Sequence, residues 1–556
     1  MIVTILTWAV IAASAYVSGA FLLSFSSCDR VHTADLTIAA GLAFLTVYAQ
    51  IFSLFYHVGA LAFLTLAVLC LVFLVLLRKK GVRILRLLPM ADASRTSWKW
   101  IFVVLTVFAF AFWTAKTPSA YDTSLYHAQA IRWIEEYGVV PGLGNLHNRF
   151  AYNSSFLCLQ ALFSFRWLLG QSLHSVNGFI AVLAVCYAVL TQSFRKEALF
   201  SDFLKLSALA YLYEQRDDIS SPNTDLMALL MVWYVLVKWT ELAERKEERT
   251  TPWCVLCILS AFTMTLKLSS ALLVLLTVYP LVLLIRHHEG KKLVLSLLSG
   301  IVCLAPWMAR SVILSGYLIY PVSRLDLFDV DWKMSPSVLS YDSMEISVWG
   351  RSVKDVSRYH EPLPSWVRVW FLAQTTTHKV LIVLAAASFV LCLVSVLTGL
   401  IRKTMSPAMA VGLAVMLSCT LMWFFSAPDT RYGKIYLFLL ISWLLYQCFS
   451  HFGQTVIPLI GVPLLAVLLG AVLVHDEGIF VQEADYPSCA VQGVSWNNQT
   501  VYLPTGGDQA GYEYFPSTPY GQLLEQIELR GEDWSDGFRV KEEYRMEHRN
   551  AYGNVW

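Results

Sequence analysis

The chain has 556 residues, of which 57% are hydrophobic and only 14% are charged, and its mean hydropathy is +0.57. Soluble domains have about 45–50% apolar and about 25% charged residues, so a soluble fold could not bury this much apolar surface. The net charge of +2 and the lack of a basic run interleaved with aromatic residues argue against a nucleic-acid partner. We therefore predict an integral membrane protein.

Apolar runs predict about fourteen membrane-spanning helices, because a spanning helix needs about 20 mostly apolar residues and polar backbone cannot face lipid unpaired. The first run has no early positive patch and no small-residue cleavage pattern, so we interpret it as a retained span. The runs at 198–213 and 253–267 are short enough to be tilted, broken or re-entrant. The predicted spans are 2–26, 34–55, 58–77, 99–115, 174–194, 198–213, 223–242, 253–267, 269–286, 292–309, 379–400, 406–425, 433–449 and 455–475.

Basic residues predict the orientation of these spans, because short cytoplasmic loops are enriched in Lys and Arg. When the predicted spans are counted along the chain, five basic connections all fall on one side of the membrane: 78–99, 195–196, 245–249, 286–292 and 402–403. The larger segments 116–173 and 310–378 and the tail 476–556 are then extracytoplasmic, as are both termini. We expect the functional chemistry on this outer face.

Asp122 directly follows a predicted span and begins a predicted amphipathic helix in the first outer segment. Its carboxylate could simply cap that helix by accepting hydrogen bonds from the first free N–H groups. His127 follows within two turns, and residues 137–155 are polar and rich in glycine. So polar a loop between apolar helices indicates a site.

A second outer turn, residues 214–225, is dense in charge. It carries Glu214, Arg216, Asp217, Asp218 and Asp225 between two apolar helices. A solvated turn could be acidic without any function. Asp225, however, begins the next span, and ionisable groups at membrane depth are costly and usually functional.

Three cations lie where predicted spans emerge on the outer face: Lys267, Arg310 and Arg431. The alternative for Lys267 is that its long side chain snorkels to the headgroups without binding a ligand. Cations at this depth favour the hypothesis that anions bind at the outer leaflet.

Four strings resemble those of little-characterised bacterial membrane proteins placed near the GT-C superfamily of membrane glycosyltransferases. That superfamily includes the protein O-mannosyltransferases and the bacterial aminoarabinose transferases. The resemblance covers about residues 99–475, but three spans precede the Asp122 loop, and the acidic pair of many members is here a single aspartate. The strings are residues 121–127 (Tyr-Asp-Thr-Ser-Leu-Tyr-His), 219–225 (Ile-Ser-Ser-Pro-Asn-Thr-Asp), 314–321 (Leu-Ser-Gly-Tyr-Leu-Ile-Tyr-Pro) and 427–432 (Ala-Pro-Asp-Thr-Arg-Tyr).

The resemblance implies transfer of a sugar, with inversion, from a polyprenyl-phosphate-linked donor to a glycan, lipid or protein acceptor at the cell surface. Asp122 would be the general base, with a pKa raised by partial desolvation. The guanidinium groups of Arg310 and Arg431 and the ammonium group of Lys267 would stabilise the leaving phosphate. The acidic turn could bind sugar hydroxyls or a divalent cation such as Mg²⁺ or Mn²⁺. The expected substrate-binding residues are Tyr126, His127, Arg216, Asp217, Asp218, Asp225, Lys267, Arg310, Tyr317 and Arg431.

The expected fold is an all-α integral membrane protein of the bacterial cytoplasmic membrane, in contact with membrane lipid. It comprises N-terminal spans (1–98), a GT-C-like module (99–475) with outer loops 116–173, 214–224 and 310–378, and a small extracytoplasmic α/β domain (476–556). A strand and turn are predicted from Trp496 onward. The alternatives are a transporter, a lipid-linked glycan flippase or polymerase, and a membrane scaffold. Transporters often contain inverted repeats, and the sequence shows no such symmetry.

Overall fold

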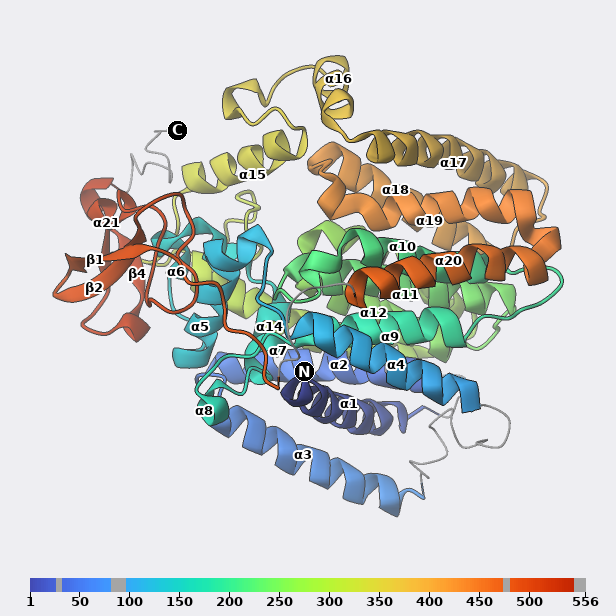
Figure 1. Cartoon of the computed structure of the whole chain (residues 1–556), viewed down its shortest axis with the longest axis horizontal. Helices are drawn as coiled ribbons and strands as arrows, with labels where there is room; N and C mark the ends of the chain where they lie inside the picture. Colours follow the sequence, from blue (N-terminus) through green and yellow to red (C-terminus); the bar gives the residue numbers. More distant parts are fainter. Residues whose placement is uncertain (27–32, 82–96, 474–480, 545–556) are drawn as a thin grey trace.

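The structure is a computed structural model that describes residues 1–26, 33–81, 97–473 and 481–544. It is a bundle of long helices with a small β region at one end (Figure 1). Within these residues, nine helical segments are long and apolar enough to cross a membrane. The chain is thus a mostly helical, multi-pass membrane protein, as predicted from its composition.

Each of the fourteen predicted spans coincides with a helix, although the count of fourteen crossings stays a prediction. Helices α4, α9 and α12 are short, and α19 and α20 form one continuous apolar run. The predicted helix at 269–286 begins as a 3₁₀ helix, η7. The elements are α1 (Ile2–Leu23), α2 (Ala34–Ser53), α3 (Ala60–Lys79), α4 (Ser97–Thr114), α9 (Val176–Leu190), α10 (Phe200–Glu214), α11 (Thr224–Glu244), α12 (Thr250–Leu266), η7 (Leu268–Thr277), α13 (Val278–Arg286), α14 (Gly290–Ser315), α17 (Thr376–Ile401), α18 (Pro407–Ser426), α19 (Thr430–Phe449) and α20 (Gly453–Leu473).

The segments between these long helices fold into short helical turns. Part of the basic connection 78–99 lies outside the described residues. The short elements are η4 (Thr123–His127), α5 (Ala128–Glu136), α6 (Leu143–Leu146), η5 (Asn148–Tyr152), α7 (Ser155–Leu162), α8 (Arg166–Leu169), η6 (Arg216–Asp218), α15 (Pro336–Gly350), η8 (Val356–Arg358), α16 (Leu363–Ala373) and η9 (Ser450–Phe452).

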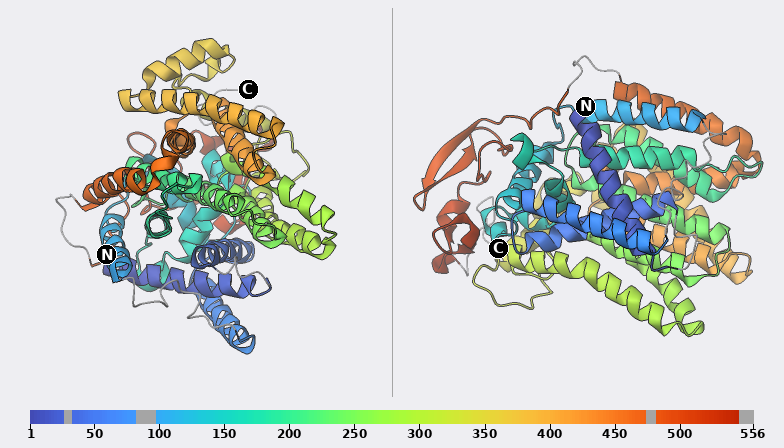
Figure 2. Two further views of the ribbon diagram at one scale, coloured as in Figure 1. Left: turned by 90° about the vertical axis from the view of Figure 1, so that its right-hand side faces the viewer. Right: turned by 90° about the horizontal axis from the view of Figure 1, so that it is seen from below.

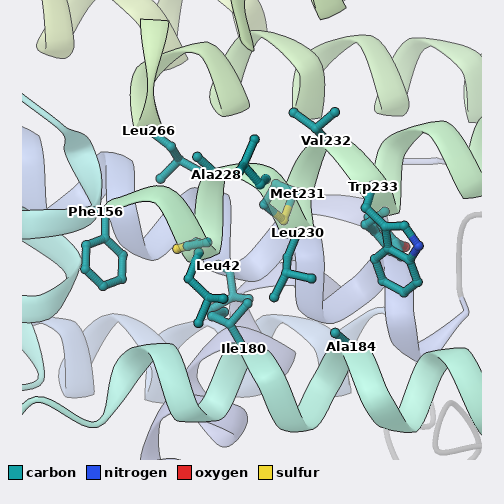
Figure 3. Close-up of a cluster of buried hydrophobic side chains, with 14 of the residues drawn as sticks. Leu42, Phe156, Ile180, Ala184, Ala228, Leu230, Met231, Val232, Trp233 and Leu266 are labelled. Atoms are coloured by element: carbon teal, nitrogen blue, oxygen red, sulfur yellow. The ribbon is translucent and has the colours of Figure 1, made fainter. Parts of the chain in front are cut away.

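Helix α11 forms the centre of the bundle, and its whole apolar stretch is buried. Its side chain Leu230 lies in a cluster with Leu42 of α2, Ile180 of α9 and Phe156 of α7 (Figure 3). Peripheral helices such as α3 and α17 instead expose most of their apolar side chains. A helix that is apolar all round needs either protein or lipid on every side, so these exposed faces suit contact with lipid.

Helices α1 and α2 approach each other closely through glycine. A Cβ on Gly19 would lie 1.8 Å from the carbonyl oxygen of Thr37, and a Cβ on Gly41 would lie 1.7 Å from that of Ala15. Any side chain at either position would force the two backbones apart. Small residues allow this close packing between apolar helices.

The C-terminal region forms two small antiparallel sheets that lie against the first outer segment (Figures 1 and 2). The predicted strand and turn are confirmed, because Asn497 and Asn498 form a two-residue hairpin turn with φ of 48° and 59°. The amide of Phe538 donates to the carbonyl of Pro141 over 2.9 Å. The elements are β1 (Val491–Trp496), β2 (Gln499–Pro504), α21 (Leu523–Gln526), β3 (Ile527–Leu529), η10 (Trp534–Asp536), β4 (Phe538–Val540) and η11 (Glu542–Tyr544).

The predicted orientation can be tested with two exposed positions, Ser495 on β1 and Thr404 between α17 and α18. In intact cells, a Ser495→Cys variant should react with an impermeant thiol reagent, whereas Thr404→Cys should react only after permeabilisation. The parent protein provides the background, since it has eleven cysteines of its own. The reverse labelling pattern would place the C-terminal region in the cytoplasm and contradict the assignment from basic loops.

Candidate functional site

Asp122 lies at the start of η4, but its carboxylate makes no capping hydrogen bond with that helix. The alternative in which Asp122 is a helix cap is therefore wrong. Turn η4 is a π-helical turn that continues into α5, and such turns are frequent at functional sites. Its geometry leaves the Asp122 carboxylate free to bind other parts of the chain.

Five charged side chains form an alternating series that we call the ion-pair chain. Arg149 lies 3.8 Å from one Asp122 oxygen, and Arg431 Nη2 donates to the other over 2.8 Å. Arg431 Nε lies 3.5 Å from Asp225 Oδ2. Lys267 Nζ contacts the other Asp225 oxygen. The structure thus brings together four of the predicted site residues and adds Arg149.

Helix ends position two members of the ion-pair chain. Asn223 caps α11 by accepting from the amide of Asp225 over 2.7 Å. Asp429 caps α19 in the same way, accepting from the amide of Arg431 over 2.8 Å. Lys267 directly follows α12. The ends of α11, α12 and α19 that the basic loops predict to be extracytoplasmic therefore meet at one place.

The two carboxylates of the ion-pair chain are buried, whereas the side chains of its three cations are 22–34% exposed. Asp122 is 8% exposed and Asp225 is 2% exposed. Within ion-pair distance, three cations face two carboxylates, so the cations of this ion-pair chain outnumber its carboxylates by one. At low dielectric such an excess favours an anionic ligand.

The predicted rise in the pKa of Asp122 is wrong. Burial raises the pKa of this carboxyl group, but the guanidinium groups of Arg431 and Arg149 lower the pKa below its ordinary value. Asp122 is therefore ionised at neutral pH. An ionised carboxylate is the form that accepts a proton, but it is a weak base as long as these cations stay beside it.

Aromatic and imidazole groups surround the ion-pair chain. His127 is 1% exposed, and neither ring nitrogen has a hydrogen-bond partner. Burial lowers the pKa of His127 to about 3, so this ring is neutral at physiological pH. The Tyr126 ring lies 5.9 Å from the guanidinium of Arg149, and Arg431 donates to the Tyr432 hydroxyl over 2.8 Å.

Most of the acidic turn is separate from the ion-pair chain. Asp217 is 69% exposed, and its nearest cation, Arg216, lies 4.0 Å away and is 39% exposed. Asp218 is buried and accepts from the side-chain amides of Gln215 and Asn223 over 2.8 and 2.9 Å. These residues are a solvated ion pair and a structural carboxylate, and only Asp225 from this turn joins the site.

The acidic residues do not form a metal site. Glu214 pairs with Lys434 over 3.2 Å, and Asp225 is occupied by Lys267 and Arg431. In the part of the chain that the structure describes, no group of three or more His, Cys, Asp or Glu side chains could hold a metal ion. The four carboxylates considered for Mg²⁺ or Mn²⁺ thus point to separate partners.

Two other predicted residues lie apart from the ion-pair chain. Arg310 Nε donates to Asn153 Oδ1 over 3.2 Å, and its Nη1 donates to the Ser53 hydroxyl. Tyr317 is fully buried and donates to the carbonyl of Met334 over 3.1 Å, a structural contact. Arg310 therefore does not join Arg431 and Lys267 in one cluster.

The C-terminal region holds the Asp122 segment in place. The carbonyl of Ser124, within the π-helical turn, accepts from the amides of Ala510 and Gly511 over 3.0 and 2.9 Å. Gln129 donates to the carbonyls of Gly511 and Tyr514. No local sequence pattern indicates this contact. Arg149, by contrast, was visible as a cation within the polar stretch 137–155.

A family described as "Domain of unknown function (DUF8201)" matches residues 1–438. The chain belongs to this family. The DUF8201 match contains the first three spans and the whole ion-pair chain, whereas α20 and the C-terminal region lie beyond it. No curated protein and no solved structure matches the chain.

The buried His127 predicts a pH dependence for the stability of this DUF8201 protein. Its pKa is lowered from 6.5 to about 3, so the unfolded chain binds a proton that the folded chain does not. Stability is then complete above pH 6.5 and falls as the pH drops below it, by about 1–2 kcal/mol at pH 5.5. Thermal unfolding at several pH values should show a smaller acid loss for His127→Gln, whereas His360→Gln, at an exposed histidine, should behave like the parent. Equal acid loss in both variants would contradict this origin.

Proposed function

We propose that this protein is a GT-C-like glycosyltransferase that moves a sugar from a polyprenyl-phosphate-linked donor to a cell-surface acceptor on the extracytoplasmic face. The observation that carries the proposal is the ion-pair chain, in which the buried Asp122 contacts Arg149 and Arg431 directly and is linked through Asp225 to Lys267. Transfer of a phosphate-linked sugar calls for two kinds of group, and the ion-pair chain contains both. The transfer needs cations for the leaving phosphate and a carboxylate for the attacking hydroxyl.

In the proposed step, the acceptor hydroxyl oxygen attacks the anomeric carbon as the bond from that carbon to the phosphate oxygen breaks. The bonding electron pair leaves with the phosphate, and the hydroxyl proton passes to Asp122. Attack from the side opposite the leaving group inverts the anomeric configuration. Arg431 and Lys267 stabilise the charge that grows on the phosphate, Arg431 with two parallel hydrogen bonds and Lys267 as a point charge.

Donor binding would also activate the base. Arg431 lowers the pKa of Asp122 while the two are paired. A phosphate competes for the same guanidinium, and withdrawal of Arg431 from Asp122 raises the pKa of the carboxylate toward a useful value. The carboxylate thus becomes a better base when the donor is present.

A second candidate function is transport of a lipid-linked glycan, and charges at the opposite end of α11 favour it. There Lys238 pairs with Asp35 over 2.6 Å, and Lys205 pairs with Glu241 over 2.9 Å. Buried charges at both ends of a central helix are compatible with a polar path across the bundle. A transporter has no need for proton transfer at Asp122, so the two functions are distinguishable.

Asp122→Asn tests the proposed base. It should lower sugar transfer about 10²–10⁴-fold, the usual contribution of a general base. Cells that lack the native protein and carry the variant should fail to regain the missing glycan. Asp225→Asn removes a carboxylate from the same ion-pair chain and should cost far less in turnover, while Asp217→Asn, at an exposed site, should be neutral. Activity of Asp122→Asn within about threefold of the parent would exclude Asp122 as the base.

Lys267→Gln and Arg149→Gln test the phosphate site. Each should weaken donor binding by about 1.5–3 kcal/mol, the range for a hydrogen bond to a charged group. The measurement is the KM for the polyprenyl-phosphate donor in proteoliposomes. Arg216→Gln is the matched control, since Arg216 is a half-exposed cation of the neighbouring turn. An unchanged KM in the first two variants would remove them from the phosphate site.

A further inference from the structure

Asp342 is a fully buried acidic residue of α15, and the proposed reaction does not use it. Three side chains donate hydrogen bonds to its carboxyl group. Asn148 and Tyr152 donate to one oxygen over 2.9 and 3.0 Å, and Tyr320 donates to the other oxygen over 3.1 Å. A buried carboxyl group is costly unless hydrogen bonds satisfy it. Both oxygens of Asp342 are therefore engaged in a contact of defined geometry.

Two of these donors belong to η5, the short 3₁₀ helix that carries Arg149. Asn148 directly precedes Arg149, and Tyr152 ends the same helix. Both donate to the same oxygen of Asp342, so the two ends of η5 are tied to one point on α15. Among the residues that the structure describes, Arg149 forms an ion pair with Asp122 alone. Asp342 therefore acts on Arg149 through η5 and not by pairing with its charge.

The contact lies beside a small hydrophobic cluster that is separate from the main core of the bundle. Ala151 of η5 packs there with Tyr320 and with Leu339 of α15, and the Tyr152 ring packs against the same cluster. Ala151 and Leu339 are fully buried. Since protein interiors are closely packed, η5 cannot shift relative to α15 without opening this cluster.

The far end of α15 is also fixed in place. Gly350 packs so tightly against the turn before α19 that a Cβ there would lie 2.8 Å from the carbonyl carbon of Ala427. Trp370 of α16 donates to the carbonyl of Pro428 in the same turn over 2.5 Å. Arg431 follows this turn, in the first residues of α19. The segment 310–378 therefore contacts both parts of the chain whose arginines flank the proposed base.

We propose that Asp342 is a positioning residue that holds η5 so that the guanidinium of Arg149 stays beside Asp122. Without the carboxyl group, the side chains of Asn148 and Tyr152 would lose their shared acceptor, and a buried donor without a partner is destabilising. Asp342 touches no reacting atom in the proposed step. Its role rests on the proposed function only because Arg149 is assigned there to the donor phosphate, whereas the position of η5 can be measured separately.

Hydrogen exchange of the full chain in detergent, followed by mass spectrometry, tests whether Asp342 holds η5. In Asp342→Ala, the amides of residues 148–152 should exchange at least about tenfold faster than in the parent, while those of α11 keep their rate. Asp342→Asn keeps an oxygen that can accept from Asn148 and Tyr152, so it should exchange like the parent. Asp329→Ala, at an exposed aspartate of the same outer segment, is the control. Parent-like exchange at 148–152 in Asp342→Ala would overturn the proposal.

A double-mutant cycle tests whether the effect reaches Arg149. Asp342→Ala should raise the KM for the polyprenyl-phosphate donor at least about threefold but no more than Arg149→Gln does, and the double variant should match Arg149→Gln. Asp342→Asn should keep the KM of the parent. Two factors that multiply in the double variant, or an unchanged KM in Asp342→Ala alone, would overturn the positioning role. If Arg149→Gln itself leaves the KM unchanged, the proposed phosphate site fails, and exchange at 148–152 still decides the role of Asp342.

Tyr152→Phe approaches the same contact from η5 and keeps the test decisive if Asp342→Ala does not fold. It removes only the hydroxyl that donates to Asp342 and keeps the ring that packs on the small cluster. We expect exchange at 148–152 to rise at least about threefold, and Tyr359→Phe, in the same outer segment but outside the cluster, to match the parent. Parent-like exchange in a folded Tyr152→Phe would contradict the assignment.

Discussion

The position of Arg431 between Asp122 and Asp225 is the interaction on which the end of the bundle where α11 and α19 begin depends. One guanidinium joins the first outer segment, the start of α11 and the start of α19. Because α11 is buried along its whole apolar length, Asp225 has no access to bulk water that could solvate it alone. Removal of one partner would leave a buried charge unpaired, at a typical cost of about 3–5 kcal/mol. The pairs therefore fix the relative positions of these elements as well as the charges themselves.

The C-terminal region packs against the same end of the bundle. A π-helical turn changes the hydrogen-bonding pattern of its carbonyls, and here the carbonyl of Ser124 is taken by the amides of Ala510 and Gly511. The region thus stabilises the turn that presents Asp122. The C-terminal region lies beyond the part of the chain that the DUF8201 family matches. The family match therefore includes the turn but does not include the amides that hold it.

Hydropathy predicted the helices well, because the bilayer requires long apolar runs whose backbone groups are satisfied within the helix. It also led to Asp122, Asp225, Lys267 and Arg431, since ionisable residues at the ends of apolar spans stand out. The pairing could not be predicted in the same way. Arg310 and Arg431 have equivalent positions in the sequence, and only tertiary packing gives Arg431 two carboxylates and Arg310 none. The contact between Ser124 and the tail joins residues nearly 400 positions apart and has no local signal.

The two arginines differ in charge balance, and this difference decides what an anion would meet at each of them. An anion that binds Arg431 must compete with Asp122 and Asp225, so its binding is coupled to the basicity of Asp122. An anion that binds Arg310 displaces only neutral partners, so its binding changes no carboxylate. Catalysis requires interactions that change between the ground state and the transition state. Of the two arginines, only Arg431 is therefore placed so that the binding of an anion would change the basicity of Asp122.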